Sequence, residues 1–328
     1  MVDIAGRDAA KCTPLITTKL GKSSLTASRL CYGCWRIAGT RDQFQNAVEA
    51  DAGGRAALIA AYEAGYTIFD GADIYGGGRC EEIMGRTLRE VSGMRERILI
   101  TSKCGVRPAG SPNPNSPGRY DFSAEHIVKA CEQSLARLGI ETIDLYLLHR
   151  PDYLGDPHEI AGAFAQLYDA GKVRFFGVSN FRPSLVHALQ AACPFPLVVN
   201  QVEISLAQRA AFEDGTLDQC LEKNITPMAW SPLGAGLLGD GAKRLLPGQR
   251  GYKTDDVVKV LDEIANGRGV SRSVIAYAWL LKHPSRIVPI VGTTNPGRIR
   301  EAVRATEFEL TREEWYRLFV AARGEPLP

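Results

Sequence analysis

The sequence has no long hydrophobic segment and no long run of charge of one sign. Its longest apolar run, 274–281, is far shorter than the roughly 20 residues that cross a bilayer, and its first residues lack the apolar core of a signal peptide. The formal net charge is only +2. We therefore expect neither a membrane protein nor a surface that binds nucleic acid or lipid.

The histidines and cysteines suggest neither a metal site nor a disulfide framework. None of the histidines has the spacing of metal ligands, so no metal is expected; they are His126, His149, His158, His187 and His283. The eight cysteines are irregularly spaced, which is typical of reduced thiols in a cytoplasm, where we expect this protein. Cys31-Tyr-Gly-Cys34 is spaced like a redox or metal pair, but it falls on a predicted strand and no second ligand pair follows.

Strand and helix patterns alternate along the chain after a short hairpin predicted over 15–26, with Gly21 near its turn. Eight apolar segments are predicted as strands, at 28–33, 67–70, 98–103, 143–149, 174–179, 198–203, 226–230 and 287–291. Helices are predicted near 53–64, 80–90, 123–138, 158–170, 183–192, 216–223, 255–281 and 296–305. Eight such units predict an α/β fold, a (β/α)8 TIM barrel with an N-terminal β-hairpin, as one domain over 1–328.

A doubly wound sheet is the competing architecture. It would have a Gly-x-Gly-x-x-Gly turn after an early strand and an acidic residue about 20 positions later. The early glycines at 76–78 lack that spacing, so the barrel is favoured. Two long loops, 105–121 and 231–254, follow strands and should lie over the carboxyl face of such a barrel, where active sites are built.

Three predicted strands end in residues that can carry chemistry. Asp70, Lys103 and His149 stand at these ends, and Tyr75 follows the first. An ammonium beside a phenol favours the phenolate and lowers its pKa, a carboxylate can hold the ammonium, and a histidine can hydrogen-bond the group that exchanges a proton. Each residue alone could be structural, as an ion pair, a rim aromatic or a strand cap. Together they suit carbonyl–alcohol interconversion.

At these residues the sequence resembles an aldo-keto reductase. The resemblance covers about residues 28–305 and rests on Asp70-Gly-Ala-Asp-Ile-Tyr75-Gly, Thr101-Ser-Lys103, Leu147-Leu-His149-Arg-Pro-Asp152, Gly177-Val-Ser-Asn-Phe181, Asn200-Gln-Val-Glu203 and Trp230-Ser-Pro-Leu-Gly234. The runs around Asp73, His149 and Gln201 look most like the bacterial YdhF-like branch of oxidoreductases.

The resemblance implies a nicotinamide cofactor, NADP(H), across the carboxyl face of the barrel. It implies that Ser179, Asn180 and Gln201 hold the carboxamide and that Trp230 stacks on the nicotinamide. The remaining implied contacts are Ser231, Leu233 and Gly234 around the pyrophosphate, and Gly292, Thr293, Asn295, Arg298 and Glu301 toward the adenosine end, with Arg298 on the 2′-phosphate.

Some positions depart from the family pattern. Gly71 stands where a threonine is usual, Gly292 where many relatives have a lysine near the 2′-phosphate, and Ala302 where an asparagine is usual. These departures affect the strength of the NADP preference. Asp73 is interpreted as a loop or helix-side charge, with a catalytic role as the alternative.

The sequence therefore predicts reduction of an aldehyde or ketone with NADPH, with Tyr75 giving the proton. The substrate pocket should include Trp35, Ile74 and the 105–121 loop, but neither the substrate nor the oligomeric state follows from the sequence. Two alternatives stay open. One is a nicotinamide-binding sensor or channel-type subunit with little turnover. The other is a hydrolase or lyase that uses Lys103 as a Schiff base, which would need an unpaired lysine in apolar surroundings.

Overall fold

The computed structural model of the protein describes residues 15–39, 47–241, 249 and 251–328. Eight parallel strands close into a barrel, each hydrogen-bonded to the next in chain order and the last to the first. They are β3 (Cys31–Gly33), β4 (Ile68–Asp70), β5 (Leu99–Cys104), β8 (Ile143–Leu148), β9 (Val173–Ser179), β10 (Leu197–Glu203), β11 (Thr226–Trp230) and β12 (Val288–Val291). The predicted TIM barrel is thus confirmed.

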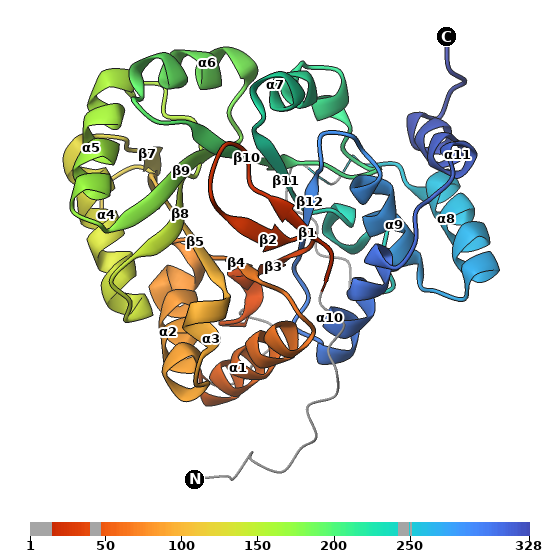
Figure 1. Ribbon diagram of the computed structural model, residues 1–328, viewed down its shortest axis with the longest axis horizontal. Helices are drawn as coiled ribbons and strands as arrows, with labels where there is room; N and C mark the ends of the chain where they lie inside the picture. Colours follow the sequence, from red (N-terminus) through yellow and green to blue (C-terminus); the bar gives the residue numbers. More distant parts are fainter. Residues whose placement is uncertain (1–14, 40–46, 242–248, 250) are drawn as a thin grey trace.

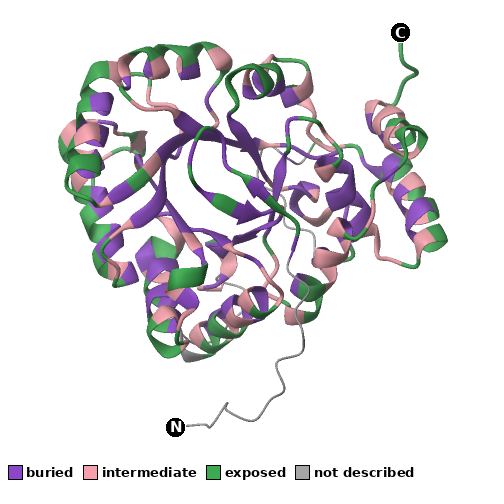
Figure 2. Ribbon diagram, in the orientation of Figure 1, coloured by how far each residue is buried: buried purple, intermediate pink, exposed green. Residues whose placement is uncertain are grey.

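Helices surround the barrel (Figure 1). They are α1 (Ala47–Glu63), α2 (Arg79–Glu90), α3 (Met94–Arg97), α4 (Ala124–Leu138), α5 (Pro157–Asp169), α6 (Pro183–Ala192), α7 (Thr216–Lys223), α8 (Asp255–Arg268), α9 (Arg272–Leu281), α10 (Pro296–Ala302) and α11 (Arg312–Arg323). Because helices cover its outer face and side chains fill its interior, the sheet is buried on both sides, as the purple strands of Figure 2 show.

Helix α4 illustrates how the local sequence builds this ring. Its buried positions include Ile127, Cys131, Leu135 and Leu138, which recur at helical spacing and face the barrel. The Ser123 side chain caps its first turn, and Gly139 ends it with a positive φ of 66°.

The N-terminal hairpin closes the barrel at the amino ends of its strands. Its strands β1 (Thr17–Lys19) and β2 (Thr26–Ser28) pair antiparallel and cross the barrel end that faces the viewer in Figure 1. Leu20 and Leu25 are buried in the interior core of the barrel. At the turn, Gly21 has a φ of +50°, and a Cβ there would lie 2.5 Å from the Val198 carbonyl oxygen, so no larger residue fits.

Several predicted elements differ in the structure. The single helix expected over 255–281 is two helices, α8 and α9, because Gly269 ends the first in a left-handed conformation and Ser271 precedes the second. The 296–305 helix stops at Ala302 and continues as a 3-10 turn, Val303–Thr306. The 105–121 loop contains an unpredicted hairpin, β6 (Val106–Arg107) with β7 (Arg119–Tyr120).

Helices α3 and α11 were also not predicted. Helix α11 packs against α8 outside the barrel ring, where Arg268 forms an ion pair with Glu314. Its start carries a full capping box, in which Thr311 and Glu314 bond each other's backbone N–H, and this Thr-x-x-Glu pattern was available in the sequence. Arg298 lies in the first turn of α10, and α11 follows α10 as a further helix.

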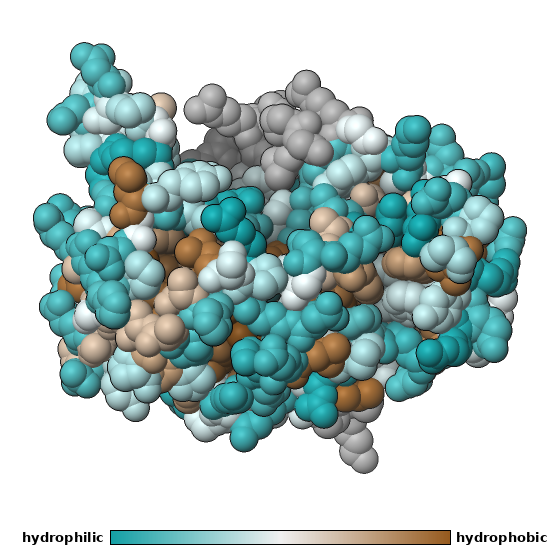
Figure 3. Space-filling view, turned by 90° about the horizontal axis from the view of Figure 1, so that it is seen from above, coloured by the Kyte–Doolittle hydropathy of each residue, from teal (hydrophilic) through white to brown (hydrophobic). Residues whose placement is uncertain are grey.

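The side of the molecule seen in Figure 3 is mostly hydrophilic, with hydrophobic residues in small separate patches. Within the described ranges, no helix combines the length and the apolar character needed to span a membrane.

Candidate active site

The barrel brings the four predicted catalytic residues together at its carboxyl end. Asp70 is the last residue of β4, Lys103 lies near the end of β5, His149 follows β8, and Tyr75 begins a 3-10 turn, Tyr75–Gly78. Lys103 Nζ lies 2.8 Å from Asp70 Oδ2 and 3.1 Å from Tyr75 Oη. The Tyr75 and His149 rings pack edge to face, with centroids 5.6 Å apart. Residues from three strands and one loop thus form one cluster.

Lys103 is completely buried and uses all three of its N–H donors. Besides Asp70 and Tyr75, it donates to the Gly71 carbonyl oxygen at 2.7 Å. Burial lowers the pKa of Lys103, but the Asp70 carboxylate and Tyr75 outweigh that effect, so the pKa is raised above its ordinary value. Lys103 is therefore a fixed ammonium at neutral pH.

The environment of Tyr75 gives a result that the sequence did not predict. Burial raises the pKa of Tyr75 to about 12, although Lys103 acts to lower it. The expected lowering by the ammonium is thus real but smaller than the effect of burial. Tyr75 keeps its proton at neutral pH, which suits a group that donates one.

Three glycines position Tyr75. Gly76, Gly77 and Gly78 all have positive φ, at 59°, 66° and 94°, a conformation that side chains with a Cβ rarely adopt. The chain therefore turns sharply after Tyr75 and enters α2 at Arg79. The turn keeps the phenol next to Lys103.

His149 is neutral at neutral pH. Burial lowers the pKa of its imidazole well below the ordinary value, and the nearby cations Lys103 and Arg150 lower it further. Its Nδ1 atom is buried and, among the described residues, has no hydrogen-bond partner. A neutral imidazole can donate one N–H, as hydrogen-bonding a carbonyl oxygen requires.

A directed chain of hydrogen bonds runs along the neighbouring strand ends. Trp230 Nε1 donates to Asn180 Oδ1 at 2.9 Å, Asn180 Nδ2 donates to Ser179 Oγ at 2.8 Å, and Ser179 Oγ donates to the Gln201 backbone oxygen at 2.8 Å. Gln201 Nε2 donates to Asp70 Oδ1 at 2.8 Å. Because a carboxylate only accepts, this last bond fixes which way the Gln201 amide points and joins the chain to the catalytic cluster.

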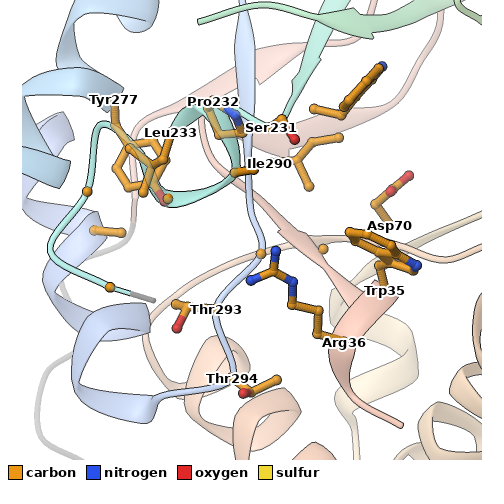
Figure 4. Close-up of a pocket in the computed structure, with 18 of the residues that line it drawn as sticks. Trp35, Arg36, Asp70, Ser231, Pro232, Leu233, Tyr277, Ile290, Thr293 and Thr294 are labelled. Atoms are coloured by element: carbon orange, nitrogen blue, oxygen red, sulfur yellow. The ribbon is translucent and has the colours of Figure 1, made fainter. Parts of the chain in front are cut away.

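One cavity of about 640 Å³ connects the cluster with the adenosine-side residues predicted from the sequence. Of the predicted residues, those that line it are Trp35, Asp70, Ile74, Tyr75, His149, Ser179, Asn180, Gln201, Trp230, Ser231, Leu233, Gly292, Thr293, Asn295, Arg298 and Glu301. In Figure 4, Asp70 and Trp35 lie at one end and Leu233 and Tyr277 at the other. Lys103 lies behind the wall, and Gly234 is buried and does not line the cavity.

The far end of the cavity carries a cation. Arg298 lines it on α10, whose first turn is capped by Asn295, and its guanidinium donates to the Asp240 carbonyl oxygen at 3.2 Å. No acidic side chain of the described residues forms an ion pair with it. A Cβ on Gly292 would have no neighbour within 4 Å, so this position opens into free space.

Strained backbone marks the same cavity. Asn180, Ser231 and Ala235 have positive φ values of 61°, 49° and 55°, which cost free energy in residues other than glycine. All three line the cavity. Such strain commonly gathers at binding sites, where the surrounding structure holds it in place.

Sequence reasoning missed several lining residues. Arg36, Arg150 and Tyr277 line the cavity, and Figure 4 shows Arg36 beside Trp35 within it. Arg36 and Arg150 directly follow predicted site residues, which was an available signal. Tyr277 lies inside a helix with no such signal. From the 105–121 loop, Val106 and Tyr120 line the cavity.

Two further sequence interpretations concern Asp73 and the cysteine pair. Asp73 does lie in a loop, between β4 and the Tyr75–Gly78 turn, but its Oδ1 atom is buried without a hydrogen-bond partner in the described parts of the chain, and burial, with Glu81 nearby, raises its pKa to about 7. The Cys31 and Cys34 pair is not wholly on a strand, because Cys34 begins a 3-10 turn. Burial raises the pKa of both thiols well above the ordinary value, which makes them poor nucleophiles and metal ligands.

The sequence model of the Aldo/keto reductase family matches residues 29–320. The chain belongs to this family. A 6-dehydroglucose reductase of Novosphingobium aromaticivorans is 40% identical over 317 residues, which cover 94% of this chain and 96% of that protein. The oxidoreductase YdhF of Escherichia coli is 42% identical over 265 residues, covering 80% of this chain and 85% of that protein. The expected YdhF-like branch is thereby confirmed.

A solved structure of similar fold supports the same family assignment. The glycerol dehydrogenase of Gluconobacter oxydans aligns with a TM-score of 0.81 at 26% identity, covering 95% of this chain and 97% of that chain. A protein of Arabidopsis thaliana described as a probable voltage-gated potassium channel subunit beta is 31% identical over 308 residues, a lower identity than that of the two bacterial relatives above. Carbonyl reduction is thus the general activity that these relatives indicate for this aldo-keto reductase.

Proposed function

We propose that this aldo-keto reductase reduces an aldehyde or a ketone to the alcohol with NADPH, with Tyr75 as the general acid. The observation that carries the proposal is the position of Lys103 Nζ between Asp70 Oδ2 (2.8 Å) and Tyr75 Oη (3.1 Å). Lys103 thereby holds the protonated phenol of Tyr75 at the wall of a cavity that His149 also lines.

The residues of the cavity suit nicotinamide adenine dinucleotide phosphate. A bound NADPH would supply the hydride that reduces the carbonyl carbon. Ser179, Asn180 and Gln201 would hold the carboxamide, and Gln201 suits this because its amide nitrogen is engaged by Asp70 and its oxygen is left to accept. Trp230 would lie against the nicotinamide. Toward the other end the proposed contacts are Ser231, Leu233, Gly234, Gly292, Thr293, Asn295, Arg298 and Glu301.

The protein's own groups handle the proton. Tyr75, whose pKa is about 12, would give its proton to the carbonyl oxygen as negative charge develops there. Lys103 would stabilise the phenolate that remains, because the ammonium is only 3.1 Å from the phenol oxygen. Neutral His149 would donate a hydrogen bond to the same carbonyl oxygen and orient it.

The two alternative functions are less well supported. A Schiff-base mechanism needs a neutral lysine, whereas Lys103 donates three hydrogen bonds and its pKa is raised. A sensor or channel-type subunit would not need the catalytic cluster, whereas Asp70, Lys103 and Tyr75 are hydrogen-bonded together here. Tight NADPH binding without turnover on any carbonyl compound would favour it.

The test follows NADPH oxidation with a panel of aldehydes, ketones and hydroxyaldehydes. Tyr75→Phe should lower kcat by about a hundredfold or more and leave NADPH affinity unchanged, because the hydroxyl acts only when the proton moves. The matched control is Tyr168→Phe, which changes an exposed tyrosine of α5 and should retain full activity. A Tyr75→Phe variant with roughly a tenth of wild-type kcat or more would remove Tyr75 from the acid role.

We further propose that 1–328 form one barrel domain that acts in the cytoplasm. The seven described cysteines are all free thiols, which supports a reducing compartment.

A further inference from the structure

Arg150 stands out among the cavity residues because the proposed reaction gives its guanidinium no contact with the carbonyl or the cofactor, although its charge helps to keep His149 neutral. It directly follows His149 at the end of β8, and its guanidinium lies over the Trp230 ring, 5.2 Å from the centroid. Within the described residues it forms no hydrogen bond or ion pair, whereas Arg107 and Arg137 are paired with Asp121 and Glu81. An arginine held on an aromatic face keeps its N–H edges available.

The acids around Arg150 are already engaged. Asp70 binds Lys103 with one oxygen and Gln201 with the other. Glu203 accepts a hydrogen bond from Gln249; burial, the larger effect, raises its pKa, and the charge of Arg150 lowers it. His149 adds no negative charge, since it is a neutral imidazole. Among the described residues Arg150 therefore has no carboxylate in direct ion-pair contact, and Glu203 acts on it only from a distance.

We propose that Arg150 forms an anion subsite and that the substrates are aldehydes or ketones that carry a carboxylate. The proposal rests on the proposed reduction, since the carbonyl must lie between Tyr75 and His149. A guanidinium binds a carboxylate through two parallel N–H donors, so one contact fixes both the charge and the orientation of the substrate. Arg150 is adjacent in the chain to the residue that orients the carbonyl, which lets one substrate engage both.

A neutral substrate would use this geometry poorly. Hydroxyl groups could accept hydrogen bonds from Arg150 but would leave its charge uncompensated. A carboxylate supplies both the acceptors and the missing charge. The property to measure is therefore the selectivity of the protein between a charged and a neutral substrate of the same size.

The experiment compares 4-formylbenzoate with 4-formylbenzamide, which have nearly the same size and differ in charge. We expect wild type to favour the acid in kcat/KM by about tenfold to a hundredfold, the range of one charge-assisted contact. Arg150→Gln should lose the preference and retain its activity on the amide. Arg150→Lys should keep part of it, because a lysine keeps the charge and loses the fork. The control Arg182→Gln removes an exposed charge outside the cavity and should keep the full preference.

Binding provides a readout that does not need turnover. The product pair, 4-(hydroxymethyl)benzoate and 4-(hydroxymethyl)benzamide, is titrated calorimetrically into the NADPH-loaded protein, which cannot turn over because cofactor and ligand are both in their reduced forms. Arg150→Gln should weaken only the acid. No preference in wild type, a preference that survives in Arg150→Gln, or equal losses on both compounds would overturn the anion subsite. Selective binding of the acid without reduction of either aldehyde would retain the subsite and overturn the proposed function.

Discussion

Replacing Asp70 by asparagine should change how the protein recognises the cofactor as well as how it handles the proton. Asp70 uses Oδ2 for Lys103 and Oδ1 for Gln201, each at 2.8 Å. An asparagine can still accept from Lys103, but its amide nitrogen then faces Gln201. The Gln201 amide must turn over to accept from it, which directs the Gln201 nitrogen, instead of its oxygen, toward the carboxamide site.

The size of the effect follows from the lost bond. A carboxamide N–H that meets a donor in place of an acceptor is left unsatisfied, which costs about 1–3 kcal/mol, or roughly 5- to 150-fold in affinity. The assay is a fluorescence titration with NADPH and with its reduced 3-acetylpyridine analogue, which lacks that N–H. Wild type should bind NADPH more tightly than the analogue, and Asp70→Asn should bind the two about equally.

The control is Tyr75→Phe, which removes the acid and leaves the Asp70–Gln201 bond in place. It should keep the wild-type gap between the two cofactors although it is inactive. If Asp70→Asn also keeps that gap, then Asp70 does not orient Gln201, and the reasoning is refuted.

Three further predictions concern Lys103, the 2′-phosphate and Asp73. Lys103→Met should cripple turnover. In alcohol oxidation, where Tyr75 must accept the proton, it should shift the limb along which the rate rises with pH to higher pH, because Lys103 opposes the effect of burial on the pKa of Tyr75; an unmoved limb would mean that Lys103 does not tune the phenol. Arg298→Ala should weaken NADPH binding by about ten- to a hundredfold with little effect on NADH binding. Gly292→Lys should widen the preference for NADPH, since the new side chain enters open space. Titration of both cofactors checks this, and equal weakening of NADH and NADPH binding by Arg298→Ala would assign Arg298 to the adenine. The pKa of Asp73, about 7, lies above its ordinary value, so ionisation of Asp73 destabilises the fold as pH rises from about 4 to 7. Asp73→Asn should therefore raise the free energy of unfolding by about 1–2 kcal/mol at pH 8 and by little near pH 4, as measured by urea unfolding. Equal gains at both pH values would show that the ionisation of Asp73 is not the cause.

The sequence was most informative where backbone geometry decides the outcome. Parallel strands deliver their carboxyl ends to one rim, so Asp70, Lys103 and His149 could be placed together from strand patterns alone. The break between α8 and α9 was missed although Gly269 is a typical helix end, because the apolar pattern continues across it.

Effects that depend on three-dimensional packing could not be predicted in this way. The pKa of Tyr75 is set by a balance between burial and the charge of Lys103, and only the charge could be anticipated from the sequence. The burial of Asp73 and the contact of Arg150 with Trp230 likewise depend on side chains from separate elements. Sequence position alone could not distinguish these residues from ordinary solvated charges.

The β1–β2 hairpin also limits how molecules exchange with the protein. Leu20 and Leu25 fill the amino end of the barrel, and the described residues that line the cavity lie toward its carboxyl end. A cofactor and a substrate that share the cavity would then use the same end of the barrel. If the substrate lies nearer the opening, we expect it to arrive after the cofactor and to leave before it.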